Sequence, residues 1–409
     1  MSRDSKELIV GLDIGTAKIV ALVAEITPEN RLNIIGMGSQ ESRGLRKGVV
    51  VNIEETVATI SRVVQEVELM ADCKVKDVYT GIAGSHIKSF DAHGMVAIKD
   101  KEVTAADVER VIETARAMPI PTDQEILHIL TQEFIIDDQG GIREPIGMSG
   151  FRLEVQAHIV TGAVSAAQNI VKCVRRCGLE VNDLVLQPLA SSYAVLSEDE
   201  KDLGVCLVDI GGGTTDIAVW TQGAIRYTTV IPIAGDQITN DIAMALRTPT
   251  RGAEEIKCRY GYALSQLADD NETLEVAGVD DRPSRKLSRR ALSDVIQPRV
   301  EELFDLIQIK LRQAGFQDVL SSGMVLTGGS AVMPGMVELG EEVMHMQIRL
   351  GAPKYQGTLS DVIQSPRFST AYGLLMEAKA QKKRGQKIHE TRNFKQRLER
   401  VTSWLAKNL

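Results

Sequence analysis

The sequence predicts an α/β fold in which two related lobes face one another. A strand-like run over residues 8–16 ends in a small-residue turn, and a second strand follows at 18–24. The same order recurs about 196 residues later, where a run over 204–214 ends in a glycine turn and a strand follows at 216–220. Because short apolar runs bounded by glycine are typical of buried strands, this recurrence predicts two lobes of one design.

The composition is that of an ordinary globular protein. The chain has 409 residues, of which 44% are hydrophobic, 25% are charged and 4% are aromatic, so we expect several domains with aliphatic cores. No run of eighteen apolar residues occurs, and the charged start does not resemble a signal peptide, which predicts a cytoplasmic protein without a transmembrane helix. The cysteines lack the spacing of a zinc site and are interpreted as reduced structural thiols: Cys73, Cys173, Cys177, Cys206 and Cys258.

Helical periodicity in the first half of the chain predicts four helices, over 54–70, 104–117, 166–177 and 187–196. Thr104 is the expected N-cap of the second of them. Residues 84–162 differ from the chain on either side, because short alternating segments surround a single helix there. This difference indicates an inserted subdomain.

The second half of the chain is predicted to contain three helices, over 236–246, 253–260 and 289–314, followed by a strand that runs into a glycine turn over 324–330. Pro298 predicts a junction or a kink in the long helix, since proline lacks the N–H that an interior helical position needs. Gly315 is its expected end. Residues 268–286 are polar and predict turns.

Three glycine turns, each at the end of a strand, carry the chemistry of the chain. The first turn contains Asp13, Gly15 and Thr16. The second turn spans residues 209–216, and the third spans residues 327–330. Glycine lets backbone N–H groups approach a polyphosphate closely, and an aspartate beside phosphate is understandable if Mg²⁺ and its waters lie between them. One such turn alone is interpreted as a simple strand end, whereas three together predict a nucleotide site. Neither G-x-x-x-x-G-K-[ST] nor G-x-G-x-x-G occurs.

These turns resemble the two phosphate motifs and the adenosine motif of the actin, sugar-kinase and heat-shock chaperone superfamily. Three further segments resemble its connecting helices and its adenosine-contacting helix: 187–194, 371–374 and 253–257. All motifs appear in the order of the superfamily. The resemblance implies an actin-like ATPase fold that binds ATP or ADP together with Mg²⁺.

Roles follow from the resemblance, residue by residue. It implies that Asp13 and Asp209 hold Mg²⁺ through water. Gln187 lies where the superfamily orients the attacking water, and Asp209 and Asp216 lie nearby as catalytic candidates. The implied phosphate contacts are Gly15, Thr16, Lys18, Gly211, Gly212, Gly213, Thr214 and Thr215. The implied adenosine contacts are Glu254, Lys257, Gly328, Gly329 and Ser330.

Within this superfamily the chain resembles the FtsA family of bacterial cell-division proteins. The insertion at 84–162 is of the FtsA type, and further similar stretches occur at 82–86, 128–134, 177–179, 189–193 and 351–353. The resemblance implies an order of subdomains: IA (1–83), IC (84–162), IA (163–195), IIA (196–227), IIB (228–302), IIA with a return to IA (303–378), a linker (379–392) and an amphipathic helix (393–409).

The C-terminal segment contrasts with the rest of the chain in charge. Residues 379–409 hold ten Lys or Arg and two Asp or Glu, whereas the remaining residues hold 37 and 53, so a basic tail of +8 follows an acidic body of −16. At about 100° per residue, an apolar stripe of about 140° contains Phe394, Leu398, Val401, Trp404, Leu405 and Leu409. The basic residues around it are Lys395, Arg397, Arg400 and Lys407.

Such a stripe predicts a helix that lies in a membrane interface. Arg397 lies inside the edge of the stripe, where its stem can snorkel. The alternative is a final helix docked on its own domain. Nucleic acid is a weaker partner, because stacking aromatics are missing and the body is acidic.

The FtsA resemblance implies a peripheral protein on the cytoplasmic face of the inner membrane at the division site. Implied partners are the C-terminal tail of the division GTPase FtsZ, other copies of the chain in protofilaments, the anionic membrane and later division proteins. FtsZ is expected on 228–302, with basic candidates Arg285, Arg289, Arg290 and Arg299, each of which is otherwise a solvated surface charge. The hypothesis is a nucleotide-controlled adaptor that is at most a weak ATPase, and the alternative is a kinase or ATPase whose turnover is its purpose.

Overall fold

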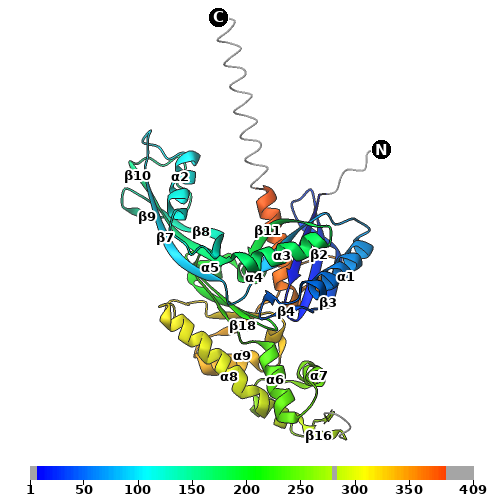
Figure 1. Cartoon of the computed structure of the whole chain (residues 1–409). Coiled ribbons are helices and arrows are strands. Elements are labelled where there is room, and N and C mark those ends of the chain that lie inside the picture. The colour runs from blue at the N-terminus through cyan, green and yellow to red at the C-terminus, as the bar shows by residue number, and fades with distance from the viewer. Residues whose placement is uncertain (1–6, 279–282, 384–409) are drawn as a thin grey trace, which may run out of the picture.

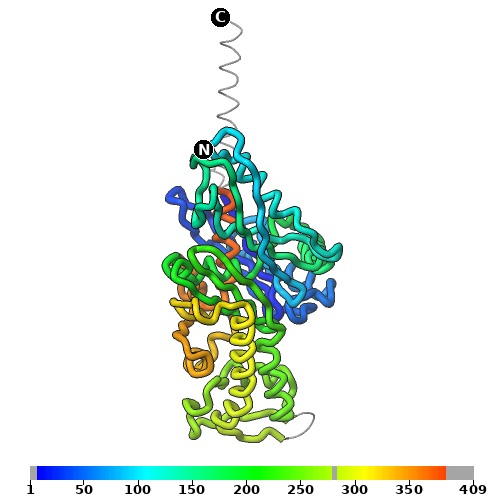
Figure 2. The backbone as a smooth tube through the Cα atoms, turned by 90° about the vertical axis from the view of Figure 1, so that its left-hand side faces the viewer, coloured from blue at the N-terminus to red at the C-terminus, as the bar shows by residue number. Residues whose placement is uncertain are grey.

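The computed structural model describes residues 7–278 and 283–383 and consists of two lobes with a subdomain inserted in the first (Figure 1). The predicted helix at 393–409 and most of the predicted linker lie outside the described residues. Residues 379–383, expected in that linker, are helical and continue a helix that starts at 369. Figure 2 shows the second lobe, in green and yellow, below the first lobe and the inserted subdomain.

A five-stranded sheet in the order β11-β6-β1-β2-β3 forms the first lobe. Its strands are β1 (Leu8–Ile14), β2 (Lys18–Ile26), β3 (Leu32–Glu41), β6 (Asp77–Ile82) and β11 (Glu180–Leu186). Helix α1 (Ile53–Ala71) packs where Gly36 and Gly38 leave room, and the helix at 369–383 packs against Gly11. Since residues alternate faces along a strand, and Gly11 opposes Leu22 while Gly38 opposes Ala21 in the ladder, the two helices cover opposite faces.

The second lobe repeats this sheet in the order β14-β13-β12-β17-β18. Its strands are β12 (Val205–Ile210), β13 (Thr215–Thr221), β14 (Ala224–Ile231), β17 (Met324–Thr327) and β18 (Ile348–Leu350). In both sheets the first three strands in sequence are antiparallel and the last two pair in parallel. The duplicated design expected from the sequence is therefore present. Both first strands are almost completely buried, as the central strands of a covered sheet are.

Three helices and a hairpin extend the second lobe away from the first (Figure 1). They are α6 (Gly235–Leu246), α7 (Thr250–Tyr260), α8 (Arg289–Gln313), β15 (Thr273–Val276) and β16 (Arg285–Ser288). Pro298 lies inside the single helix α8, so the expected junction does not occur there. The polar stretch at 268–286, expected as turns, contains β15 and the start of β16.

The inserted subdomain is a four-stranded antiparallel sheet, β7-β10-β8-β9, covered by one helix. The strands are β7 (Lys88–Ala97), β8 (Gln124–Ile136), β9 (Gln139–Ile142) and β10 (Arg152–Ala163), and the helix is α2 (Ala105–Arg116). Thr104 caps α2 as expected, in a reciprocal capping box with Asp107.

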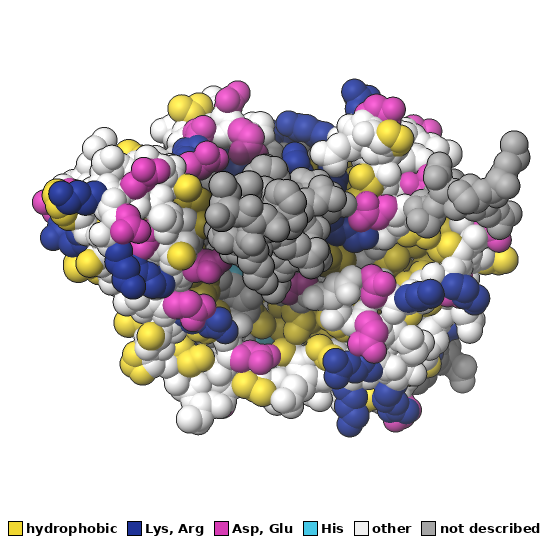
Figure 3. Space-filling view, turned by 90° about the horizontal axis from the view of Figure 1, so that it is seen from above, with side chains coloured by type: hydrophobic (Ala, Val, Ile, Leu, Met, Phe, Trp, Pro, Cys, Tyr) yellow, Lys and Arg dark blue, Asp and Glu magenta, His cyan; other side chains and the backbone are white. Residues whose placement is uncertain are grey.

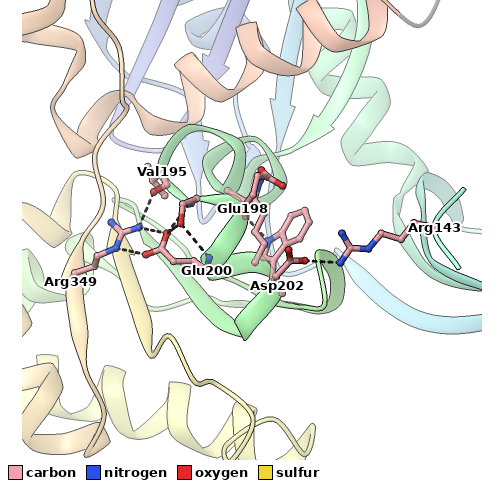
Figure 4. A network of polar contacts seen from close by, with 10 residues as sticks. Arg143, Val195, Glu198, Glu200, Asp202 and Arg349 are labelled. Carbon is pink, nitrogen blue, oxygen red and sulfur yellow. Dashed lines mark hydrogen bonds and ion pairs between the residues drawn. The ribbon is translucent and has the colours of Figure 1, made fainter. Parts of the chain in front are cut away.

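Two connecting helices join the lobes behind the cleft, α4 (Gln187–Val195) and α5 (Glu198–Leu203). From α5, Asp202 accepts from Arg143 of the inserted subdomain (2.6 Å), and Glu200 pairs with Arg349 of the second lobe (2.6 Å) (Figure 4). Arg349 also donates to the carbonyl of Val195 (3.0 Å). Helix α5 therefore links the inserted subdomain to the second lobe.

The remaining short elements are β4 (Leu45–Arg46), β5 (Val49–Val50), α3 (Val164–Arg176), η1 (Ser265–Leu267), η2 (Ser330–Val332), α9 (Met336–Met344), α10 (Ser360–Ile363) and η3 (Pro366–Phe368). Among the described residues, no helix is both long and apolar enough to cross a membrane.

Candidate nucleotide site

A cavity of about 360 Å³ lies between the lobes and is lined by residues of both. Its volume is within the range of small-molecule sites. Of the residues predicted for nucleotide, metal or catalysis, all but one line it: Asp13, Gly15, Thr16, Lys18, Gln187, Asp209, Gly211, Gly212, Gly213, Thr214, Asp216, Glu254, Lys257, Gly328, Gly329 and Ser330. The structure thus brings together residues that are spread along the sequence between positions 13 and 330. Their roles toward a ligand stay predictions.

Thr215 is the residue that the structure places elsewhere. It is fully buried, and its hydroxyl donates to the carbonyl of Ile233 (2.8 Å). Since neighbouring residues of a strand face opposite sides, Asp216 points to the cavity and Thr215 points away. The hydroxyl of Thr215, expected to contact phosphate, is thus turned away from the cavity.

The first two glycine turns have the same geometry and pack against one another. The N–H of Gly15 donates to the carbonyl of Lys18 (3.0 Å), and the N–H of Gly211 donates to that of Thr214 (2.9 Å). A Cβ on Gly212 would lie 2.7 Å from that of Ala17. Glycine is therefore needed for the two lobes to approach at their phosphate-type loops.

The third turn depends on one glycine. Gly328 has φ +92°, and a Cβ there would lie 2.4 Å from Oδ1 of Asp209. Gly329, its neighbour, has open space around it. After the turn, Ser330 donates to the carbonyl of Gly211 (2.7 Å), which joins the third turn to the second.

Three carboxylates lie at the base of the cavity, one from the first lobe and two from the second. Burial raises the pKa of Asp13 to about 7, against the influence of Lys18, and Asp209 adds to the rise. Burial, with Asp209 nearby, raises the pKa of Asp216 to about 8. Burial also raises the pKa of Asp209, although Ser191 (2.5 Å) and Thr370 (3.2 Å) donate to it.

The three carboxylates fit a magnesium ion that binds through water and phosphate. Among the described residues, no group of three or more His, Cys, Asp or Glu is arranged to hold a metal alone. Oδ1 of Asp216 is buried and has no hydrogen-bond partner in the described part of the chain, so this oxygen has a lone pair available for a metal-bound water. Asp13 and Asp209 face the same space. Mg²⁺ commonly keeps several waters and uses few carboxylates.

Lys18 and Gln187 border the same carboxylates. Burial lowers the pKa of Lys18 to about 8, partly offset by Asp13, and its ammonium group contacts the carbonyl of Arg367. Gln187, the first residue of α4, donates to Asp13 (3.2 Å). Gly81 makes room for Gln187, because a Cβ there would lie 2.8 Å from its Cγ. The amide is thus held beside the carboxylates, where it can orient a water molecule.

The opposite end of the cavity is built by α7. Lys257 is buried, pairs with Glu254 (2.7 Å) and donates to the hydroxyl of Thr239 (2.8 Å) and the carbonyl of Gly235 (3.1 Å). A charge buried in this way needs such partners. The structure therefore orients Glu254, whose side chain stays half-exposed, toward the open part of the cavity.

Sequence reasoning missed several residues that line the cavity. They include Gly48, Asp236, Cys258, Arg367 and Thr370, and Ser191 supports Asp209 beside them. The motifs that contain Ser191 and Thr370 or adjoin them were identified, at 187–194 and 371–374, but a hydroxyl alone gave no signal. Cys258 was interpreted as structural, whereas it is exposed and lines the cavity. All five cysteines, which lie in the described part of the chain, are free thiols.

The raised pKa values predict a dependence of stability on pH. Because the folded protein keeps protons on Asp13 and Asp216 that the unfolded chain loses near pH 4, its stability falls as pH rises toward 8. Burial lowers the pKa values of His86 and His128. These two groups make stability rise with pH, but only up to about pH 6.5, where the histidines of the unfolded chain lose their protons. Burial also lowers the pKa of Lys18 to about 8. This lysine therefore makes stability rise with pH, but mainly above pH 8, outside the interval in which the aspartates act.

We therefore expect the melting temperature without nucleotide to fall by about 1 °C between pH 7 and pH 8. Asp216→Asn removes one of the titrating groups, so its melting temperature should depend less on pH over this interval. Calorimetry of both proteins at several pH values measures the effect. A wild-type melting temperature that rises over this interval, or equal slopes for both proteins, would contradict the assignment.

The four arginines expected to contact FtsZ all lie on the extension of the second lobe, on β16 and α8, and each has a partner within the chain. Arg289 pairs with Glu272 (2.7 Å) and Arg290 with Asp270 (3.5 Å). Arg299 pairs with Asp241 (2.5 Å), and Arg285 donates to the carbonyl of Leu246 (2.5 Å). Their binding role stays a prediction.

Two duplicated sheets around a cavity with three glycine turns define an actin-like ATPase fold. The fold is similar to a PilM-PilN type IV pilus biogenesis complex (TM-score 0.65, 18% identity, 90% of this chain and 98% of that chain). It is also similar to MreB5 of Spiroplasma citri bound to ADP (TM-score 0.57, 15% identity, 93% and 98%). The fold class expected from the sequence is confirmed.

Relatives then identify the family. The chain is 59% identical to the cell division protein FtsA of Pseudomonas aeruginosa over 92% of this chain and 90% of that protein. It is 46% identical to FtsA of Escherichia coli K12 over 98% of both. The family model "Cell division protein FtsA" matches residues 206–373. The model "SHS2 domain inserted in FTSA" matches residues 84–161, almost the same range as the insertion expected at 84–162. The chain belongs to the FtsA family of cell division proteins.

Proposed function

We propose that this cell division protein binds ATP with Mg²⁺ in the cavity and uses it to control self-assembly on a membrane. The observation that carries the proposal is the convergence of three glycine turns, Lys18 and three buried carboxylates on one cavity between the lobes. Bound Mg²⁺ would supply the positive charge that joins these carboxylates to phosphate oxygens. Solved structures of MreB5 with ADP and with AMPPNP, which share the fold, support a nucleotide there.

Each part of the cavity has a place in nucleotide binding. Backbone N–H groups of the first two turns and Lys18 bind phosphates, while Asp13 and Asp209 position the metal through water. Glu254, Lys257 and the third turn surround adenosine. Gln187, held by Asp13, orients a water near the terminal phosphate. We propose that hydrolysis is weak and that binding is regulatory.

Nucleotide binding would hold the lobes in one relative arrangement. The first turn belongs to one lobe and the second to the other, and Gly212 contacts Ala17 directly between them. A polyphosphate that accepts hydrogen bonds from both turns favours this closed arrangement over any open one. We propose that the closed arrangement assembles into protofilaments.

The membrane and FtsZ complete the proposal. The sequence of residues 393–409 combines an apolar stripe with basic neighbours, which suits an anionic membrane interface. One such helix binds reversibly, and assembly multiplies its weak contacts. The FtsZ tail is proposed to bind 228–302, where carboxylates of an acidic tail would compete with those now paired to Arg289 and Arg290. The chain would thereby tether the FtsZ ring to the inner membrane and help to recruit later division proteins.

Co-sedimentation with anionic vesicles tests the proposal. We expect the full chain to pellet, more strongly with Mg-ATP, and to carry a labelled FtsZ C-terminal peptide with it. A chain that ends at Arg392 should stay in the supernatant in both conditions. Equal pelleting of the two chains would place membrane binding elsewhere, and equal pelleting of the full chain with and without Mg-ATP would remove the link between nucleotide and assembly.

A further inference from the structure

A basic groove lies on the first lobe, close to the point where the described chain ends. Its volume is about 540 Å³, and three segments that are distant in sequence line it. The turn between β2 and β3 supplies Arg31, the loop after β18 supplies Lys354, and the helix at 369–383 supplies Lys379 and Lys383. Figure 3 looks onto this end of the molecule, where Lys and Arg side chains generally alternate with Asp and Glu. None of the described residues that line the groove is acidic.

The lysines of the groove lack the partners that cations have elsewhere in the molecule. Lys354, Lys379 and Lys383 form no ion pair with any carboxylate among the described residues, whereas their neighbour Lys382 pairs with Glu7 (3.2 Å). Arg31 is less isolated: hydrogen bonds from the backbone of Glu29 and from Thr27 lower the pKa of the Glu29 carboxyl, and the charge of Arg31 adds to this effect. The three lysines are therefore a local concentration of positive charge without ion-pair partners among the described residues.

Two of these lysines oppose one another. Lys379 and Lys383 are four residues apart on one helix, so their side chains lie on the same face, and like charges at this spacing destabilise a helix. Burial lowers the pKa of Lys379, and the charge of Lys383 lowers it further. An anion in the groove would relieve both effects.

The floor of the groove is apolar and aromatic. Tyr355 and Tyr372 are buried with their rings 5.6 Å apart, and Leu32 and Met376 lie beside them. The hydroxyl of Tyr355 accepts from the N–H of Ile34 (3.0 Å), which fixes the ring. An occupant that joins a negative head to an apolar body fits these surroundings better than a simple ion.

Net charge makes the remainder of the chain a poor occupant. Residues 384–409 contain seven Lys or Arg and two Asp or Glu, a net charge of +5, which does not complement a basic groove. Attached to a membrane as proposed, the same residues nevertheless bring lipid headgroups close to the groove. Residues 384–392 span at most roughly 30 Å when extended, so a membrane-bound segment at 393–409 would keep this end of the body close to lipid headgroups.

We infer that the groove binds the phosphate of an anionic membrane lipid, with Lys354 and Lys379 as its main cationic contacts. The inference rests on the proposed attachment of residues 393–409 to the membrane, which raises the local concentration of headgroups. The groove then sets which face of the first lobe meets the membrane, whereas the tail alone would leave the body free to rotate.

The first test measures binding of the full chain to vesicles that contain one third phosphatidylglycerol in phosphatidylcholine. A Lys near an anionic surface contributes about fivefold in affinity, so Lys354→Gln with Lys379→Gln should weaken binding about 25-fold at low salt. A matched control, Lys286→Gln with Lys310→Gln, removes two charges from the second lobe, where β16 lies at the far end of the molecule (Figure 1). Equal affinities of the two variants would overturn the inference.

A second test separates the groove from the tail. The full chain with Leu398→Glu and Trp404→Glu, which disrupt the apolar stripe, is titrated calorimetrically with soluble dihexanoyl phosphatidylglycerol. Saturable binding that disappears with Lys354→Gln and Lys379→Gln supports the groove, even if the wild-type tail proves not to bind vesicles. Absence of that binding, or equal binding of inorganic phosphate, would overturn the assignment to lipid.

Discussion

Replacement of Gly328 by alanine should lower the affinity for nucleotide about 100-fold or more and also destabilise the protein without nucleotide. The new Cβ would lie 2.4 Å from Oδ1 of Asp209 and 2.5 Å from the carbonyl oxygen of Ile210. The backbone at φ +92° is also unfavourable for any residue with a Cβ, at a cost of about 1–3 kcal/mol. To relieve the contact, Asp209 must move away from its present position at the base of the cavity.

The neighbouring glycine provides the control. Gly329 has an ordinary backbone conformation, and a Cβ there meets no atom within 4 Å, so Gly329→Ala should fold with nearly unchanged stability. Because Gly329 lines the cavity, its new methyl group should still reduce nucleotide affinity. Thermal unfolding without ligand and titration with a fluorescent ATP analogue distinguish the two variants. If Gly328→Ala behaves like Gly329→Ala in both measurements, the close contact with Asp209 is not important.

A second large effect is expected from Gly212→Ala, which places a methyl group between the lobes. The added Cβ would lie 2.7 Å from that of Ala17, closer than two carbons can approach. The lobes must separate at their phosphate loops, so we expect a loss of nucleotide affinity of about 10-fold to 100-fold. The same separation should abolish the ATP-dependent increase in vesicle binding.

Its partner residue offers a test by rescue. Ala17→Gly removes the atom with which the new methyl group collides, so the double variant should recover much of the lost affinity. Ala17→Gly alone should bind nucleotide nearly as the wild type does, apart from a small loss of loop rigidity. A double-mutant cycle on nucleotide affinity measures the coupling. Additive effects of the two substitutions would show that the turns do not meet when nucleotide is bound.

The sequence by itself determined the duplicated sheets and most of the cavity. β1 and β12 are apolar runs that end in glycine turns, and such local signals do not depend on the rest of the chain. Thr104 as a helix cap is local in the same sense. The order of the turns and helices identified the superfamily, and the insertion after residue 83 identified the family. Residues 393–409 show an equally clear pattern, and their binding to a membrane stays a proposal.

The tertiary structure decided which side chains face one another across long distances in sequence. Thr215 was assigned to phosphate from its place beside a glycine turn, but the alternation of β13 turns it away. Ser191 and Thr370 reach Asp209 only because α4 and the helix at 369–383 pack beside the second lobe. The basic groove likewise appears only when segments around 31, 354 and 379 meet. A turn or a strand follows from neighbouring residues, whereas a hydrogen-bond partner or an unpaired charge depends on packing between segments that no local pattern records.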